Sequence, residues 1–100
     1  MKPLYIESAD ARVRLDGPAL RVEASLRAAQ WFPLNRLSRV ITNHRSEWST
    51  DALLACAQQR IAVCFVATET VRFFEQRSAR SERLAQGLIN RLHGWLVEIE

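Results

Sequence analysis

The sequence contains few of the residues that break or cross-link a chain. In 100 residues it has three glycines, three prolines and two cysteines. So little glycine and proline argues against a low-complexity or collagen-like chain, and mixed charge with plentiful leucine, valine and isoleucine argues against disorder. Cys56 and Cys64 stand in apolar surroundings without Cys-x-x-Cys spacing, which favours two buried free thiols over a disulfide or a metal pair. This length suits one small domain with its own core.

The sequence also lacks a long hydrophobic run. Its longest uninterrupted one, residues 61–67, is far shorter than the ~20 residues that cross a bilayer. The first residues have neither the apolar centre nor the small-residue cleavage site of a secretory signal. We therefore predict a cytoplasmic protein with no membrane partner.

Lysine is almost absent. Lys2 is the only one, and the other 13 of the 14 cations are arginine, in a chain with a formal net charge of +3. The planar guanidinium offers a fork of donors that suits phosphates and carboxylates. This excess is compatible with a nucleic-acid partner but does not identify one, because genomic base composition also favours arginine over lysine.

A β-hairpin is the clearest local pattern. Residues 11–15 and 20–24 each alternate apolar and polar side chains, and Asp16-Gly17-Pro18-Ala19 between them is a turn sequence. Such alternation puts the apolar side chains on one face and the charged ones on the other. We predict either a solvated charged face or a set of phosphate contacts. The candidate DNA-binding residues on it are Arg12, Arg14 and Arg21.

Further strands and a helix are expected along the chain. Residues 37–42 predict a strand, residues 61–67 a central buried strand, and residues 70–74 one more strand. Ser49-Thr50-Asp51 predicts a helix start, with a capping side chain followed by an acidic residue. The inward stripe of that helix is expected to consist of Leu53, Cys56 and Ala57.

The last part of the chain predicts an amphipathic helix from near Arg80 to near Val97. Its apolar stripe needs a partner, and we take four of its residues as a candidate dimer or partner interface: Leu84, Leu88, Leu92 and Trp95. The expected domains are residues 1–76, β-rich with an embedded helix, and residues 77–100, a C-terminal helix that is an extension or the start of a further helical domain. The expected fold class is α+β, with a small, β-sandwich-like antiparallel sheet.

No catalytic motif is present. The sequence has no Gly-x-Ser-x-Gly, no phosphate-binding glycine loop and no His-Glu-x-x-His. His44, near Glu47, is the one place where a small enzyme site can be imagined, and a solvated loop histidine is the alternative that we favour. We therefore predict no catalytic residue and no metal ligand. Tryptophans stack bases in some nucleic-acid sites, but Trp31 and Trp95 stand in apolar stretches and are predicted to be core.

Three apolar patterns occur in a recognisable order. Residues 33–40 read P-L-x-x-L-x-x-V, residues 49–53 read S-T-x-A-L, and residues 57–65 read A-x-x-x-I-x-V-x-F. In this order they resemble the N-terminal domain of the CRISPR adaptation integrase, the CRISPR-associated endonuclease that inserts new spacers. The resemblance covers roughly residues 3 to 75. It departs from the family at Asn43 and His44, where the family usually has glycine.

The resemblance implies a non-catalytic domain for homodimerisation that also forms a platform for duplex DNA. Arg12, Arg14 and Arg21 would then contact phosphates, and a second CRISPR adaptation protein is a further expected partner. The family's metal-binding catalytic residues lie in a helical C-terminal domain, so the resemblance transfers no catalytic residue and no cofactor to these positions. We expect an N-terminal piece of such an integrase. The alternative is a stand-alone interaction or regulatory module with the same fold and no nuclease activity.

Overall fold

The structure, a computed structural model, describes residues 1–81. Two helices, α1 and α2, and a short 3-10 turn, η1, accompany the strands. The elements in chain order are β1 (Lys2–Ile6), β2 (Arg12–Asp16), β3 (Ala19–Glu23), β4 (Gln30–Pro33), η1 (Leu34–Arg36), β5 (Leu37–Asn43), β6 (Glu47–Trp48), α1 (Thr50–Gln58), β7 (Ala62–Val66) and α2 (Thr68–Ser81).

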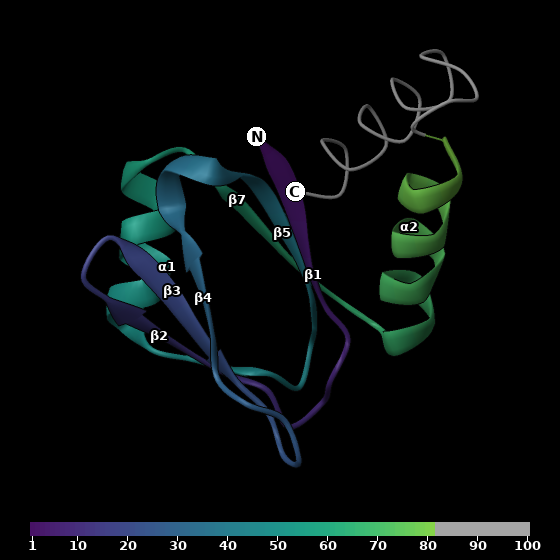
Figure 1. The fold of residues 1–100 in the computed structure, drawn as a ribbon, viewed down its shortest axis with the longest axis horizontal. Coiled ribbons are helices and arrows are strands. Elements are labelled where there is room, and N and C mark those ends of the chain that lie inside the picture. The colour runs from purple at the N-terminus through teal and green to yellow at the C-terminus, as the bar shows by residue number, and fades with distance from the viewer. Residues whose placement is uncertain (82–100) are drawn as a thin grey trace.

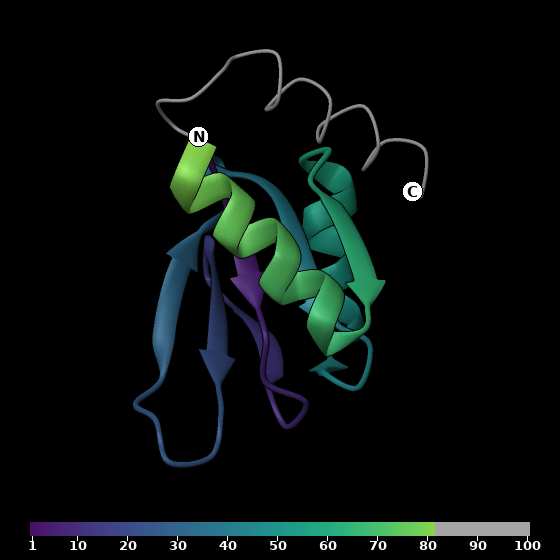
Figure 2. The same cartoon turned by 90° about the vertical axis from the view of Figure 1, so that its right-hand side faces the viewer.

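The strands form two sheets that lie against each other. Sheet A has the order β1-β5-β7 and all its strands are parallel, whereas sheet B has the order β4-β3-β2-β6. In sheet B, β2, β3 and β4 are antiparallel, and β6 joins β2 in parallel. Sheet A is the middle layer, with α2 on one face and sheet B and α1 on the other (Figures 1 and 2). The α+β class is confirmed.

The prediction of a purely antiparallel sheet is wrong for sheet A. Its strands are far apart in the sequence, and each connection runs through another element: sheet B strands between β1 and β5, and α1 between β5 and β7. A tight turn reverses the chain direction, whereas a crossover through a packed element returns the next strand in parallel. Local alternation gives no information about that direction.

The predicted hairpin is confirmed. Val13 pairs with Val22 and Leu15 with Leu20 across β2 and β3. Gly17 has φ +57° at the first central position of the two-residue turn, where a side chain would be strained. The apolar residues of the hairpin therefore share the inner face of sheet B, and its arginines share the outer face.

Two apolar clusters lie on opposite faces of sheet A. The first lies between the two sheets and α1, and Leu20, Val40 and Cys56 are among its fully buried members. The second lies between sheet A and α2 and consists of Ile41, Cys64, Val71 and Phe74, with Tyr5 and Val66 packed against them. Successive residues of β5, Val40 and Ile41, point to opposite clusters, so β5 is the strand that both cores share.

The prediction of residues 61–67 as a central strand is wrong, because β7 is an edge strand of sheet A. The apolar run reflects contact with both clusters, because Val63 packs against the first and Cys64 belongs to the second, as expected for a strand of a middle layer. An apolar run does not indicate whether a strand lies at the centre or at the edge of its sheet. At this edge Phe65 is 45% exposed.

The prediction of a strand at residues 70–74 is also wrong. These residues form the first turns of α2, which begins at Thr68. Val71 and Phe74, three residues apart, are buried, whereas Phe73 is 45% exposed. That spacing is helical. The helix predicted from near Arg80 overlaps α2 at its first residues, and the rest of it lies outside the described residues.

Helix α1 begins where the sequence predicted. The Ser49 hydroxyl accepts a hydrogen bond from the Ala52 backbone N–H at 3.2 Å, and Asp51 lies in the first turn. The expected inward stripe is wrong at two positions, because Leu53 is 37% exposed and Ala57 is exposed. Ala52 and Cys56, four residues apart, face the core instead.

The C-terminal end of α1 explains how a glycine-poor chain turns directly into β7. The Ile61 N–H donates to the Cys56 carbonyl at 2.8 Å, and the Arg60 N–H donates to the Ala57 carbonyl at 3.1 Å. This is the bonding pattern of a Schellman motif, in which the first residue after the helix C-cap adopts a left-handed conformation. Arg60 adopts that conformation, with φ +57°.

Both cysteines are buried and free, as predicted. Burial raises the pKa of the Cys56 thiol, because an apolar environment disfavours the thiolate. In the described part of the chain, neither helix is long and apolar enough to cross a membrane.

Candidate nucleic-acid interface

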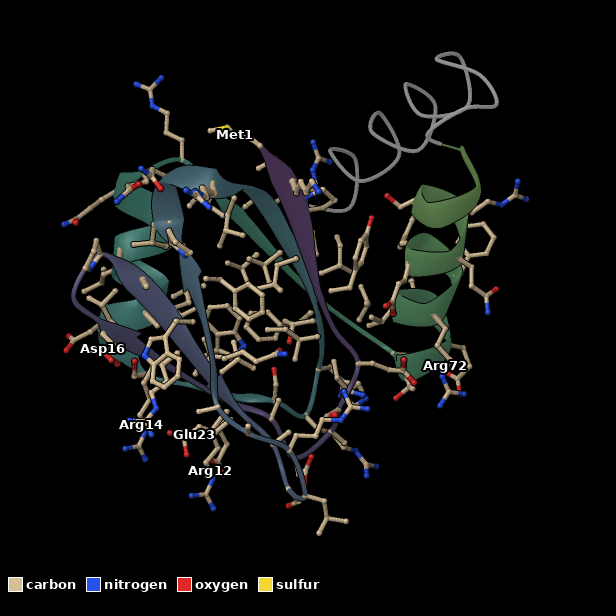
Figure 3. All side chains as sticks on the ribbon, in the orientation of Figure 1. Met1, Arg12, Arg14, Asp16, Glu23 and Arg72 are labelled. Carbon is tan, nitrogen blue, oxygen red and sulfur yellow. The ribbon has the colours of Figure 1, made fainter. Side chains whose placement is uncertain are left out.

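The three predicted arginines lie together on the outer face of sheet B. Arg12 and Arg14 stand on β2, and Arg21 stands on β3 directly opposite Arg14. The opposite residues of an antiparallel pair share one face, so strand register alone brings these guanidinium groups together. Figure 3 shows Arg12 and Arg14 projecting away from the interior of the molecule. We call this outer surface of β2, β3, β4 and β6 the arginine face.

Three acidic residues occupy the same face. Glu23 lies opposite Arg12 in the register, Asp16 follows on β2, and Glu47 comes from β6. The Nε of Arg12 is 3.8 Å from a carboxylate oxygen of Glu47. The formal charges of these three carboxylates and the three guanidinium groups cancel, which the sequence pattern did not reveal because Glu47 is remote in the chain.

Arg21 and Arg14 differ in whether they pair with a carboxylate. The Nε of Arg21 is 3.1 Å from a carboxylate oxygen of Glu23, an ion pair whose two side chains are each about two-fifths exposed. Arg14 forms no ion pair within the described part of the chain. Exposed pairs contribute little to stability, but each one weakens the field that a phosphate would meet. Of these three arginines, Arg14 is therefore the one most available to an anion.

Trp31 completes this face, and its predicted place in the core is wrong. It lies on β4 opposite Arg21, and it is 52% exposed. The Arg21 guanidinium carbon lies 5.4 Å from the centre of the indole ring, a cation–π distance. The indole N–H donates to a carboxylate oxygen of Asp16 at 2.8 Å. Trp31, Arg21 and Arg14 thus form one row across three strands.

The other candidate residues are not drawn into this row. Trp48 is half-buried, donates its indole N–H to Ser46 Oγ at 3.0 Å and meets Phe65 edge to face at 6.0 Å. His44 is exposed in the turn after β5, while the Glu47 carboxylate lies beside Arg12. Among the described residues, no three of histidine, cysteine, aspartate and glutamate are grouped closely enough to hold a metal ion.

Comparison with known proteins supports the resemblance. A family model described as CRISPR associated protein Cas1 matches residues 4–90. The chain belongs to this family. No curated protein matches it. Cas1 membership gives the domain a CRISPR adaptation context, in antiviral defence and spacer acquisition, and the match includes the whole arginine face.

A second exposed feature of this Cas1-family domain is the β7 edge of sheet A. Strand β7 pairs with β5 on one side and with no other described strand. Its sequence, Ala-Val-Cys-Phe-Val, has no charge, although exposed edges usually carry charges that prevent pairing with another chain. The predicted interface residues Leu84, Leu88, Leu92 and Trp95 lie outside the described residues.

Proposed function

We propose that this Cas1-family domain is a non-catalytic dimerisation and duplex-DNA platform for spacer acquisition. The observation that supports it most directly is the common position of Arg12, Arg14 and Arg21 on one exposed face that no described helix covers. Phosphate contacts of this kind position a duplex without reading its sequence. A stand-alone interaction module with the same fold would lack this binding.

Removing the three arginine side chains together should weaken duplex binding and reduce its salt dependence. Each phosphate contact contributes a slope of about −0.9 to log K against log salt concentration. We expect R12A/R14A/R21A to flatten the slope by about two to three, measured by fluorescence anisotropy with a blunt duplex. Because Arg12 and Arg21 already pair with Glu47 and Glu23, R14A should change the slope more than any other single substitution, by about one.

Two controls test the electrostatic explanation. E23Q/E47Q releases Arg21 and Arg12 from their acidic neighbours, so it should tighten duplex binding and steepen the slope. R36A removes an exposed arginine of η1, outside sheet B. It should change neither the affinity for the duplex nor the salt slope. Binding that is independent of salt, or a triple variant that binds like the parent, would exclude the arginine face as the platform.

The proposed dimer uses the β7 edge, where Phe65 is exposed on an uncharged strand. A carboxylate there has to be desolvated when two copies meet, so F65E should convert a dimer to a monomer in sedimentation velocity at micromolar concentration. L26E is the matched control, because Leu26 is fully exposed in the loop between β3 and β4. A parent chain that stays monomeric, or an F65E variant with the parent's mass, would contradict this interface. A dimer that binds no duplex would favour the interaction module.

A further inference from the structure

Strand β1 lies along the bottom of a groove. It is an edge strand of sheet A, as β4 is of sheet B, and neither has a second partner among the described strands. Two adjoining hollows, of about 400 and 550 Å³, share Leu4 and Phe32 and together extend along β1 from Lys2 to Glu7. Near Glu7 the groove runs between the loop before β4 and the start of α2 (Figure 1). We call this depression the β1 groove.

The bottom of the β1 groove combines apolar side chains with an open strand edge. Leu4 and Ile6 are buried members of the core between the two sheets, and Phe32 packs against that core. An edge strand presents N–H and C=O groups that its own sheet does not pair, and Pro3 is typical of such an edge because proline has no N–H. An extended peptide suits this surface, since its backbone continues the sheet while alternate side chains reach the apolar hollows.

The two ends of the β1 groove differ in charge. At the end where β1 begins, the charged side chains of the lining are Lys2 and Arg36, both positive. At the other end, where Glu7 is already paired with Arg72, the formal charges of the lining cancel. The charged residues there are Glu7, Arg27, Arg72 and Glu75. A peptide with carboxylates at one end and none at the other matches this distribution.

The strand edge and the apolar bottom favour a peptide over the other occupants. A nucleic acid would use the two cations, but it has no backbone that continues a β-sheet. A second copy of the chain would bring a whole sheet to a depression, and the uncharged β7 edge is the better surface for such pairing. The five residues of β1 extend over about 16 Å, which suits a short linear segment.

We propose that the β1 groove binds an extended peptide segment of a partner protein, with acidic residues at one end followed by alternating apolar residues. The peptide backbone adds to the edge of β1, its apolar side chains lie over Leu4 and Phe32, and its carboxylates lie near Lys2 and Arg36. The groove opens between the two sheets, whereas the arginine face is the outer surface of sheet B. This peptide site is therefore independent of the proposed DNA platform.

The test uses the whole chain and two end-blocked fluorescent peptides, Glu-Asp-Val-Thr-Ile-Thr and its reverse, because a strand can join an edge in either direction. We expect one of the two to bind in fluorescence anisotropy. Backbone N-methylation then tests the strand pairing. Methyl groups on the valine and isoleucine nitrogens, or on the two threonine nitrogens, each remove one of the two alternating sets of donors. Only the set that faces β1 should matter, and its loss should weaken binding by about 5- to 150-fold, the effect of two lost hydrogen bonds.

Two sets of variants place the peptide in the groove. Ala28 is exposed and lines it, so A28W should fill part of the groove and prevent binding. L26W is the matched control, because it puts the same ring in the same loop at a fully exposed residue outside the lining.

The variant K2A/R36A tests the charged end of the groove. It should weaken peptide binding by about 2- to 30-fold, and it should have little effect on the neutral peptide Gln-Asn-Val-Thr-Ile-Thr. Melting curves that match the parent's would show that the variants are folded. If A28W does not fold, K2A/R36A and the N-methylated peptides carry the test.

Replacing Ala28 by photoreactive benzoylphenylalanine identifies what occupies the groove. A cross-link to the peptide supports the proposal, whereas a cross-link to a second copy of the chain or to its own residues 82–100 would overturn it. Displacement of the peptide by a blunt duplex would make the groove a nucleic-acid surface and the proposal wrong. A parent chain that binds neither peptide, or an A28W variant that binds like the parent, would also refute it. None of these results bears on the arginine face, whose own variants decide the DNA platform.

Discussion

Replacing Phe74 by alanine is expected to lower the free energy of unfolding by about 3–5 kcal/mol, the usual range for deleting a buried phenylalanine. Phe74 is almost fully buried, and it packs in the small cluster of Ile41, Cys64 and Val71 between α2 and sheet A. The other buried members of that cluster are smaller than phenylalanine, so we expect the deletion to leave a cavity. Urea denaturation followed by far-UV circular dichroism would measure the loss.

The chain provides a matched control one residue away. Phe73 has the same side chain on the same helix, but it is 45% exposed and meets Phe74 edge to face at 5.4 Å. F73A should therefore lower the free energy of unfolding much less than F74A does. Hydrogen exchange adds a spatial test: α2 amides in F74A should lose more protection than β2 and β3 amides, which belong to the other core. Equal costs for the two variants would show that α2 does not dock through Phe74.

The same two phenylalanines show why part of the fold was not predictable from the sequence. Val71, Phe73 and Phe74 satisfy both a period of two and a spacing of three, and a short apolar segment does not distinguish a strand from a helix. In the structure these residues are helical, and α2 covers the face of sheet A that is opposite sheet B, with Val71 and Phe74 buried against it. The β2–β3 hairpin was predictable because its register is set by an adjacent turn that contains Gly17.

The candidate site was also predictable only in part, within the hairpin. Alternation within one hairpin put Arg12, Arg14 and Arg21 on a common face, and the register confirms it. The partners on that face come from other strands: Trp31 from β4 and Glu47 from β6. Strand order is a long-range property, so the sequence showed a basic patch where the structure shows a charge-balanced face with an exposed ring.

Asn43 is the second position at which a large effect is expected. It is a buried polar residue at the end of β5, and its amide nitrogen donates to the Glu7 carbonyl at 2.9 Å and to the Thr68 hydroxyl at 2.6 Å. Its amide oxygen accepts from the Arg45 backbone N–H at 2.9 Å. One side chain thus connects the end of β1, the turn after β5 and the start of α2.

Removing these bonds leaves buried polar groups unsatisfied, so N43A should lower the free energy of unfolding by about 2–4 kcal/mol in urea denaturation. N43D separates the two sides of the amide. It keeps the shape and the acceptor for Arg45, but it replaces the donor with an oxygen that faces the Glu7 carbonyl, and desolvation disfavours its carboxylate. We expect N43D to cost at least as much as N43A. N35A, at an exposed asparagine of η1, should stay within about 0.5 kcal/mol of the parent. An N43D variant as stable as the parent would mean that Asn43 orders only the turn at Arg45 and does not join α2 to β1.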